Sequence, residues 1–230
     1  MRAGFAIAGF FLATVAVPAC LAQDARVVAL SGTVSVKRAR EPVRALAAND
    51  LILNGDEIAT GNNSEATIRA ADGSSVHIFP DSRVVFQERS PDFEEFLHLF
   101  LGSIKVHIEK LSGRPNPHKL TTPTAVIAVR GTTFSVFVDD EDATLVAVDE
   151  GIVGVAARGM PAAEVELTRG QRCWVRRGQP PSRAQAFRGR SERADLIPMR
   201  PQRKEMRVEP RAGAPLEIRL PRRVRQMPQE

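Results

Sequence analysis

Short runs of alternating apolar and polar residues recur along the chain between residues 27 and 175. A period of two is typical of strands that bury one face. The runs 66–70 and 75–79 flank Asp72-Gly73 and predict a β-hairpin, because Asp and Gly suit tight turns. The predicted buried side of this hairpin holds Ile68, Val76 and Ile78. Strand-like runs recur at a spacing of roughly 8–12 residues, so the pattern predicts an all-β fold of stacked short strands, a β-sandwich or a solenoid-like stack.

The most apolar part of the pattern predicts the centre of the core. Five consecutive apolar residues, 125–129, predict a strand that is covered on both faces. A second run, 133–138, alternates strictly, and we expect two strands that meet at Gly131. The guanidinium of Arg130 at this junction must reach solvent or find a carboxylate or carbonyl partner, and we expect a structural role in which it pins the corner.

Other glycines and acidic residues predict further strand reversals. The segment 91–96 has helical spacing after Pro91, so a short helix competes there with strands, which we favour for the residues that follow. Residues 111–118 contain glycine and two prolines and predict an exposed loop. The pairs of runs expected to reverse are 97–101 with 103–108 around Gly102, and 143–148 with 151–155 around Asp149-Glu150.

The N-terminal residues 1–22 have the pattern of a secretory signal peptide. Arg2 precedes an apolar segment, 5–17, and small residues precede Gln23. The segment is too short for a stable bilayer anchor. We expect a mature chain that begins at Gln23 and is periplasmic or secreted; the alternative is a lipoprotein anchored at Cys20.

Removal of Cys20 would leave Cys173 as the single cysteine, which excludes an intrachain disulfide. Alternation places Cys173 opposite Trp174 on its strand. No histidine is close in sequence to lower its pKa, so we expect a small buried apolar side chain and not a reactive thiol.

Charge is unevenly distributed along the chain. Residues 176–230 carry fifteen Lys and Arg against six Asp and Glu, whereas residues 1–175 carry 17 against 21. The segment 177–230 is rich in proline and arginine and cannot bury enough apolar area to fold, so we predict a disordered basic tail. Its expected partners are an envelope protein or an anionic envelope polymer, with peripheral membrane contact as a further alternative. Nucleic acid is not expected for an exported protein.

No pattern in the chain indicates catalysis or a cofactor. The histidines lack metal-ligand spacing, and neither a Gly-x-Ser-x-Gly motif nor a phosphate-binding loop is present. The acidic run 139–142 lacks the spaced ligands of a calcium loop, so a solvated hairpin tip is the expected structure. We predict no catalytic, cofactor-binding or metal-binding residue. The four histidines are His77, His98, His107 and His118.

A succession of short motifs resembles the FecR domain. The motifs occur in the order Gly55–Gly61, Asp72-Gly73-Ser74, Pro80-Asp81-Ser82, Gly102-Ser103-Ile104, Thr122–Ala125, Val129–Phe134 and Glu150–Val153. The resemblance covers residues 26–176 and implies an all-β domain. Glycines at such positions permit tight reversals and aspartates accept backbone N–H groups, so structural roles are expected. The motif residues in question are Gly55, Asp56, Asp72, Gly73, Arg130, Gly131, Thr132, Glu150 and Gly151.

The resemblance also bears on function. The family is named for a periplasmic regulator of ferric citrate transport, and such regulators join a cytoplasmic anti-sigma segment and a transmembrane helix to a periplasmic domain. This sequence opens with a signal-like segment instead. We therefore expect a non-enzymatic periplasmic binding or scaffold module that contacts a protein or an envelope polymer and is tethered electrostatically by its tail. The first alternative is a sensory component of transmembrane signalling, and the second is an enzyme that acts on envelope polymers.

Overall fold

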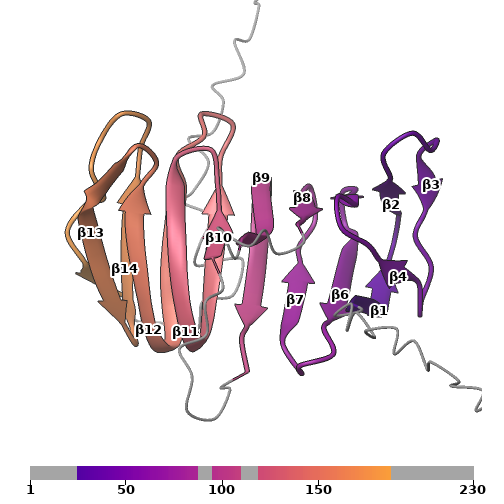
Figure 1. Cartoon of the computed structure of the whole chain (residues 1–230), viewed down its shortest axis with the longest axis horizontal. Coiled ribbons are helices and arrows are strands. Elements are labelled where there is room, and N and C mark those ends of the chain that lie inside the picture. Colours follow the sequence, from indigo (N-terminus) through magenta and orange to yellow (C-terminus); the bar gives the residue numbers. More distant parts are fainter. Residues whose placement is uncertain (1–24, 88–94, 110–118, 188–230) are drawn as a thin grey trace, which may run out of the picture. The chain divides into compact units, whose positions relative to one another are not determined.

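The computed structural model describes residues 25–87, 95–109 and 119–187, and this part of the chain consists of strands joined by turns (Figure 1). All of it lies in one compact unit, Met1–Ile197; the second unit is Pro198–Glu230. The predicted all-β class is confirmed, since the described ranges hold fifteen strands and no helix. Accordingly, they hold no helix that could span a membrane.

The strands of the N-terminal half are short, and the longest strands, β9, β11 and β12, come later in the chain. In chain order they are β1 (Ala25–Ser31), β2 (Val34–Lys37), β3 (Arg44–Ala45), β4 (Leu51–Ile52), β5 (Glu57–Thr60), β6 (Glu65–Arg69), β7 (Ser75–Ile78), β8 (Arg83–Phe86), β9 (Glu95–His107), β10 (Lys119–Thr121), β11 (Ala125–Val138), β12 (Thr144–Ala157), β13 (Met160–Thr168), β14 (Gln171–Val175) and β15 (Gln185–Ala186).

Hydrogen bonding arranges these strands in two layers that share β9, β11 and β12. The first layer has the order β15-β14-β12-β11-β9-β7-β6-β1-β4, and the second has the order β3-β2-β5-β8-β9-β10-β11-β12-β13. Inward side chains of both layers join in a single hydrophobic cluster. The arrangement is therefore a β-sandwich, in which one core is formed between two sheets.

Each shared strand crosses from one layer to the other at a glycine with positive φ. Before Gly102, β9 pairs with β8 and β10; after it, β9 pairs with β7 and β11. The corresponding glycines of β11 and β12 are Gly131 and Gly151, and the three φ angles are 92°, 54° and 89°.

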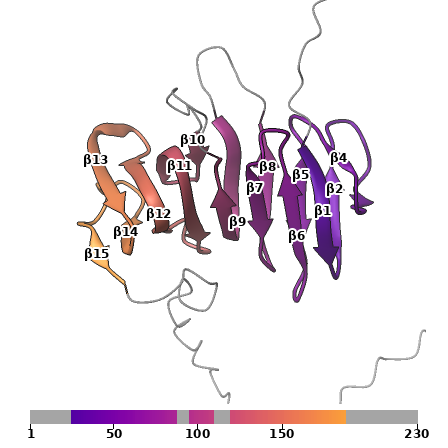
Figure 2. The ribbon, with the colours of Figure 1, turned by 90° about the horizontal axis from the view of Figure 1, so that it is seen from below.

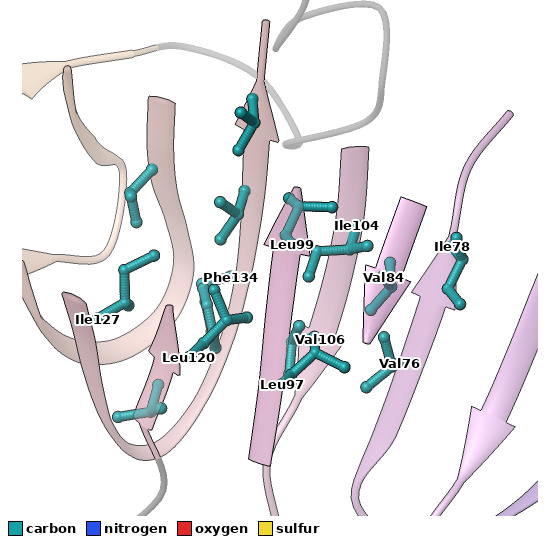
Figure 3. Packing of buried hydrophobic residues seen from close by; sticks show 14 of the residues in the cluster. Val76, Ile78, Val84, Leu97, Leu99, Ile104, Val106, Leu120, Ile127 and Phe134 are labelled. Atoms are coloured by element: carbon teal, nitrogen blue, oxygen red, sulfur yellow. The ribbon is translucent and has the colours of Figure 1, made fainter. Parts of the chain in front are cut away.

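The side-chain pattern changes at the same points. On β9 the buried apolar residues are Leu97 and Leu99 before the corner and Ile104 and Val106 after it, so the inward apolar set changes from odd to even numbers (Figure 3). A strand with unbroken alternation would turn one of these pairs away from the core. The glycine at the corner supplies the extra residue that keeps both halves facing inward.

Packing at the β9 corner excludes any side chain. A Cβ at Gly102 would lie 2.5 Å from Ser82 Cα and 2.7 Å from the Asp81 carbonyl oxygen. The buried Ser82 Oγ accepts a hydrogen bond from Ser103 N–H at 2.9 Å. The corner is therefore closed by direct contact with the turn before β8.

Several local predictions are confirmed. The hairpin around Asp72-Gly73 is β6–β7, and its expected inward residues are buried. The acidic run 139–142 is the turn between β11 and β12, where Asp139 Oδ1 accepts N–H bonds from Glu141 at 2.9 Å and Ala143 at 2.8 Å.

Other local predictions are wrong, and they share a physical cause. The expected reversals at Gly102 and Asp149-Glu150 are corners within the continuous strands β9 and β12. The two strands expected to meet at Gly131 are one continuous strand, β11, which has its corner there. The run 125–129 was expected to be covered on both faces, but Val126 and Ala128 are only half-buried. A glycine that interrupts an alternating pattern marks the point where the inward-facing residues change from odd to even numbers, or the reverse. Both a chain reversal and a corner within one strand can produce this change.

Some predictions lie outside the described residues. These are the signal peptide, the helix-or-strand alternative for most of 91–96, the loop 111–118 and the tail from residue 188 onward. The predicted tail boundary at residue 177 falls inside the described part. There, Ser182 N–H donates to the Trp174 carbonyl oxygen at 2.8 Å, and β15 pairs with β14 (Figure 2).

Candidate functional site: the polar face of the first layer

The motif residues lie in turns and corners. Asp56 is fully buried, and its carboxylate accepts two hydrogen bonds of 2.8 Å from Arg38 and one of 2.9 Å from Leu53 N–H. Burial raises the pKa of Asp56, but these hydrogen bonds outweigh it and hold the pKa below its ordinary value. The ionised carboxylate thus fixes the turn before β5, in which Gly55 has a φ of 81°.

The Asp72-Gly73 turn is more open. Asp72 Oδ1 accepts a hydrogen bond of 2.9 Å from Ser74 N–H, and Gly73 N–H donates to the Ala70 carbonyl oxygen at 3.1 Å. These bonds close the β6–β7 hairpin and leave the turn at the edge of the fold.

The remaining motif residues meet where β11 and β12 cross between layers. Arg130 is paired with Ile152 across the two strands. A Cβ at Gly151 would lie 2.5 Å from the Thr132 methyl carbon, so the two corners are in contact. Within the described part of the chain, the buried Thr132 Oγ1 has no hydrogen-bond partner. The pairing also sets Thr133 of the β11 corner opposite Glu150 of the β12 corner, beside Gly131 and Gly151.

Cys173 faces the core of the sandwich from β14 and is fully buried, as expected. Burial raises the pKa of its thiol to about 12. The thiol therefore stays protonated at neutral pH, which is not the state of a nucleophile.

Titratable side chains gather instead on the outer face of the first layer. Val76 and Ile78 point inward from β7, so His77 between them points outward. Its Nδ1 lies 2.9 Å from Thr67 Oγ1 on β6, and its Nε2 lies 3.2 Å from a carboxylate oxygen of Glu65.

The same arrangement recurs on the same face at His107. Nδ1 of His107 lies 2.8 Å from Thr133 Oγ1 on β11, and Nε2 lies 3.2 Å from a carboxylate oxygen of Glu109. The intervening Lys105 pairs with Asp149 on β12 at 3.1 Å. Each of these three basic groups, His77, Lys105 and His107, thus has an acidic neighbour.

Strand register places these groups side by side. His77 is opposite Lys105, and His107 is opposite Ser75. We use the name polar face for the outward side chains of five residues on β6, β7, β9 and β11, namely Thr67, His77, Lys105, His107 and Thr133. They project from strands that are paired on both sides, so their positions are rigid.

The chemistry available to the polar face is recognition through hydrogen bonds and charge. Its hydroxyl, imidazole and carboxylate groups occur in the order found in hydrolase relays, but acyl transfer also needs N–H donors for an oxyanion. Thr67 and Thr133 lie on strands that are hydrogen-bonded on both sides, so the surrounding N–H groups belong to the sheet ladder. The arrangement suits binding better than catalysis.

A third histidine is held similarly on the outer face of the second layer, but it is buried. His98 Nδ1 lies 2.5 Å from Thr121 Oγ1, which also hydrogen-bonds to the Glu95 carboxylate. An ionised Glu95 can only accept, so Thr121 donates to it and His98 donates from Nδ1. Burial lowers the pKa of His98; Glu95 opposes this effect and Arg158 adds to it.

Metal ligands do not converge in the part of the chain that the structure describes. Among 25–87, 95–109 and 119–187, no group of three His, Cys, Asp or Glu side chains could hold a metal ion. His118 is outside these ranges.

Sequence reasoning missed the polar face, although one signal for it was available. Thr67 and His77 are each five residues from Asp72, so the predicted hairpin register would have placed them opposite each other. His107 and Thr133 are 26 positions apart and meet only through the β9–β11 pairing. No local pattern indicates that contact.

Comparison with known proteins gives one family-model match and two distant structural likenesses. Residues 56–154 match the family model described as FecR protein. No curated protein matches the chain. Two crystal structures described as "a putative anti-sigma factor from Parabacteroides distasonis ATCC 8503" align with TM-scores of 0.47 and 0.46, at 20% and 19% identity.

Each of these alignments covers 56% of this chain and 59% of the other, so the chain spans less than two thirds of those proteins. The matched family segment runs from the buried Asp56 through the three glycine corners to β12. The match confirms, for residues 56–154, the resemblance to the FecR domain that the sequence motifs indicate.

Proposed function

We propose that this protein is a non-enzymatic signalling component that acts by binding a partner. The observation that carries the proposal is the FecR match over residues 56–154, because the family is named for a regulator of transport-linked transcription. The buried motif residues support it further, since they maintain the architecture and leave recognition to surface groups.

The polar face is the binding surface that we favour. It presents two imidazole groups and one ammonium group, each next to a carboxylate, and two hydroxyl groups, each next to an imidazole nitrogen. Such a mixed surface suits a polar protein partner, because complementary charges confer specificity more than affinity. A glycan could also hydrogen-bond to these groups, which keeps an envelope polymer as the second candidate partner.

The finer parts of the proposal concern location and tethering. We propose a periplasmic or secreted protein whose basic residues 188–230 hold it near an anionic envelope surface. Fractionation of cells would test this: the protein should be released by high salt, and a cytoplasmic location would contradict it.

The functional test combines deletion with surface variants. Deletion of the gene should change transcription of a limited set of genes, and the wild-type chain should restore it. The variant H77Q/K105Q/H107Q should fail to restore it and should lose its crosslinked partner. The control K37Q, which changes an exposed lysine on β2, should behave like the wild type.

Two results would contradict the proposal. Unchanged transcription after deletion would remove the signalling role. Full activity of the triple variant would move the binding surface away from the polar face while leaving signalling intact.

A further inference from the structure

The two layers end in four edge strands of very different length. The first layer ends in β15 and β4, and the second ends in β3 and β13. Three of these strands have two residues each, whereas β13 has nine, Met160–Thr168. Within the described part of the chain β13 pairs with β12 alone, and it lies at the outer end of the row of strands (Figure 1). The far side of β13 is therefore a long open edge.

Strand register shows which backbone groups point to this edge. Immediately after β12, Arg158 N–H donates to the Thr124 carbonyl oxygen at 2.8 Å. Residues of an antiparallel strand direct their N–H and C=O groups to its two neighbours alternately, so the even-numbered residues here bond to β11 and the odd-numbered ones to β13. Val165 is opposite an odd-numbered residue of β12 and bonds to it. Its neighbours Glu164 and Glu166 therefore direct their N–H and C=O groups to the open edge.

The same two residues hold the acidic side chains of the edge. Val165 packs against the core and Leu167 is fully buried, so Glu164 and Glu166 point outward, and both are exposed. Within residues 25–87, 95–109 and 119–187, neither carboxylate has a hydrogen-bond or ion-pair partner. These acids thus differ from the carboxylates of the polar face, which neutralise basic neighbours.

This combination fits an extended peptide chain as the ligand. Free N–H and C=O groups on a sheet edge bind an added strand through main-chain hydrogen bonds, and the adjoining side chains select its sequence. The inward residues of an added strand would lie beside the half-buried Val165, where apolar β-branched side chains extend the core. Its outward residues would lie opposite Glu164 and Glu166, where opposite charge is favoured.

We propose that the open edge of β13 binds an extended segment of a partner protein in which Lys or Arg alternates with β-branched apolar residues. The segment adds a strand to the second layer. Its N–H and C=O groups pair with those of Glu164 and Glu166, and its basic side chains face the two carboxylates.

Charge disfavours two other occupants. A second copy of this chain, paired through its own β13, would bring the acidic side chains of the two copies next to each other, and like charges across a strand pair are destabilising. An anionic polymer would also be repelled by Glu164 and Glu166, and it has no N–H groups in the register of a strand. The edge therefore favours a basic protein segment.

The proposed strand site is independent of the polar face. The polar face lies on the first layer, whereas β13 is the last strand of the second layer. The FecR match ends at residue 154, before β13 begins, so the proposal does not rest on the function of that family. The two surfaces can be tested separately.

A probe peptide with hydrogen-exchange NMR tests the edge directly. The probe is a capped peptide in which Lys alternates with Val, and it is titrated into the full-length protein. Binding should slow exchange of the Glu164 and Glu166 amides about tenfold, because these N–H groups gain acceptors. The amides of Val165 and Leu167 already bond to β12 and should change little.

Two further peptides separate strand pairing from charge. In the first, the amides that would donate to the edge are N-methylated, which keeps every charge but removes the hydrogen bonds, and binding should be lost. In the second, Glu replaces Lys, which keeps the strand pattern but opposes like charges, and binding should be about tenfold weaker.

Protein variants provide the matched comparison. E164K/E166K should weaken binding of the Lys–Val peptide about tenfold, because two cross-strand charge pairs become repulsive. The control E41K/E141K makes the same change in net charge at two exposed glutamates outside the strands and should bind like the wild type. The polar-face variant H77Q/K105Q/H107Q should also bind like the wild type.

Several results would overturn the proposal. Equal binding of the N-methylated peptide would show attraction by charge alone, and unchanged exchange of the Glu164 and Glu166 amides would show that no strand is added. Slow exchange of these amides without any peptide would mean that the chain covers its own edge. If that protection increased with protein concentration, a second copy would be the occupant.

Discussion

Two acidic-glycine pairs in this protein have the same backbone angle and opposite roles. Gly73 and Gly151 both have a φ of 89° and both follow an acidic residue. Gly73 reverses the chain between β6 and β7, whereas Gly151 lies within the continuous strand β12 and moves it from one layer to the other. The φ angle of the glycine therefore does not distinguish a turn from a corner.

The difference lies in what surrounds each glycine. A Cβ at Gly73 would meet only the flexible Glu109 side chain, at 3.7 Å, while a Cβ at Gly151 would lie 2.5 Å from the Thr132 methyl carbon. A turn glycine needs only freedom of φ, but a corner glycine also needs an absent side chain, because a second strand packs against it. This contrast can be tested by substitution.

Gly102→Ala should have the largest effect. Its Cβ would overlap backbone atoms of Asp81 and Ser82, and its φ of 92° is unfavourable for alanine. Strain and overpacking together should lower the free energy of unfolding by about 4 kcal/mol. Gly73→Ala should lower it by only about 1 kcal/mol, since the angle alone is unfavourable there. Urea denaturation of both variants measures the difference, and equal losses would contradict the distinction between corner and turn.

The next largest effect should be a difference in stability cost between substitutions of the two turn aspartates, Asp56 and Asp72. Asp56→Ala removes the partner of Arg38 from a fully buried site and should cost about 3 kcal/mol, whereas Asp72→Ala should cost about 1 kcal/mol. Because the pKa of Asp56 is lowered in the folded state, its contribution is present at neutral pH and is lost as pH falls through that lowered pKa. The difference in the free energy of unfolding between the wild type and Asp56→Ala should accordingly become smaller in acid. Urea denaturation at several pH values would measure it.

A smaller effect should show that the two β-strand corners touch. Gly151→Ala should be destabilising in the wild type, and less so in a Thr132→Ser background, which removes the methyl group 2.5 Å from the new Cβ. A double-mutant cycle should give a coupling free energy of about 1 kcal/mol. The same Thr132→Ser background should leave the cost of Gly73→Ala unchanged, and additivity at Gly151 would argue against the contact.

The smallest effect should come from His98 at the start of β9. Its pKa is lowered by burial, so the unfolded chain binds a proton more readily, and stability should decline as pH falls below the ordinary value of 6.5. The variant His98→Asn should lose this part of the pH dependence, as measured by unfolding between pH 7 and pH 5. A steeper decline in the variant than in the wild type would contradict the assignment.

Much of this fold can be predicted from the amino-acid sequence. The alternation of Ile68, Val76 and Ile78 about Asp72-Gly73 determines a hairpin, because both strands and their turn lie within a few residues. The burial of Cys173 likewise follows from alternation on its own strand. The aspartates and glycines of the turns could be assigned because their chemistry is local.

The corners and the polar face required the tertiary structure. Gly102, Gly131 and Gly151 interrupt alternation just as turn glycines do, and only the partners on either side decide whether the chain reverses or continues. His107 meets Thr133 solely because β9 and β11 pair after both have crossed between layers. Sequence by itself determined the strands and the positions of positive φ, since these depend on neighbouring residues; the sandwich, its corners and its outer surfaces were decided by pairings between distant strands.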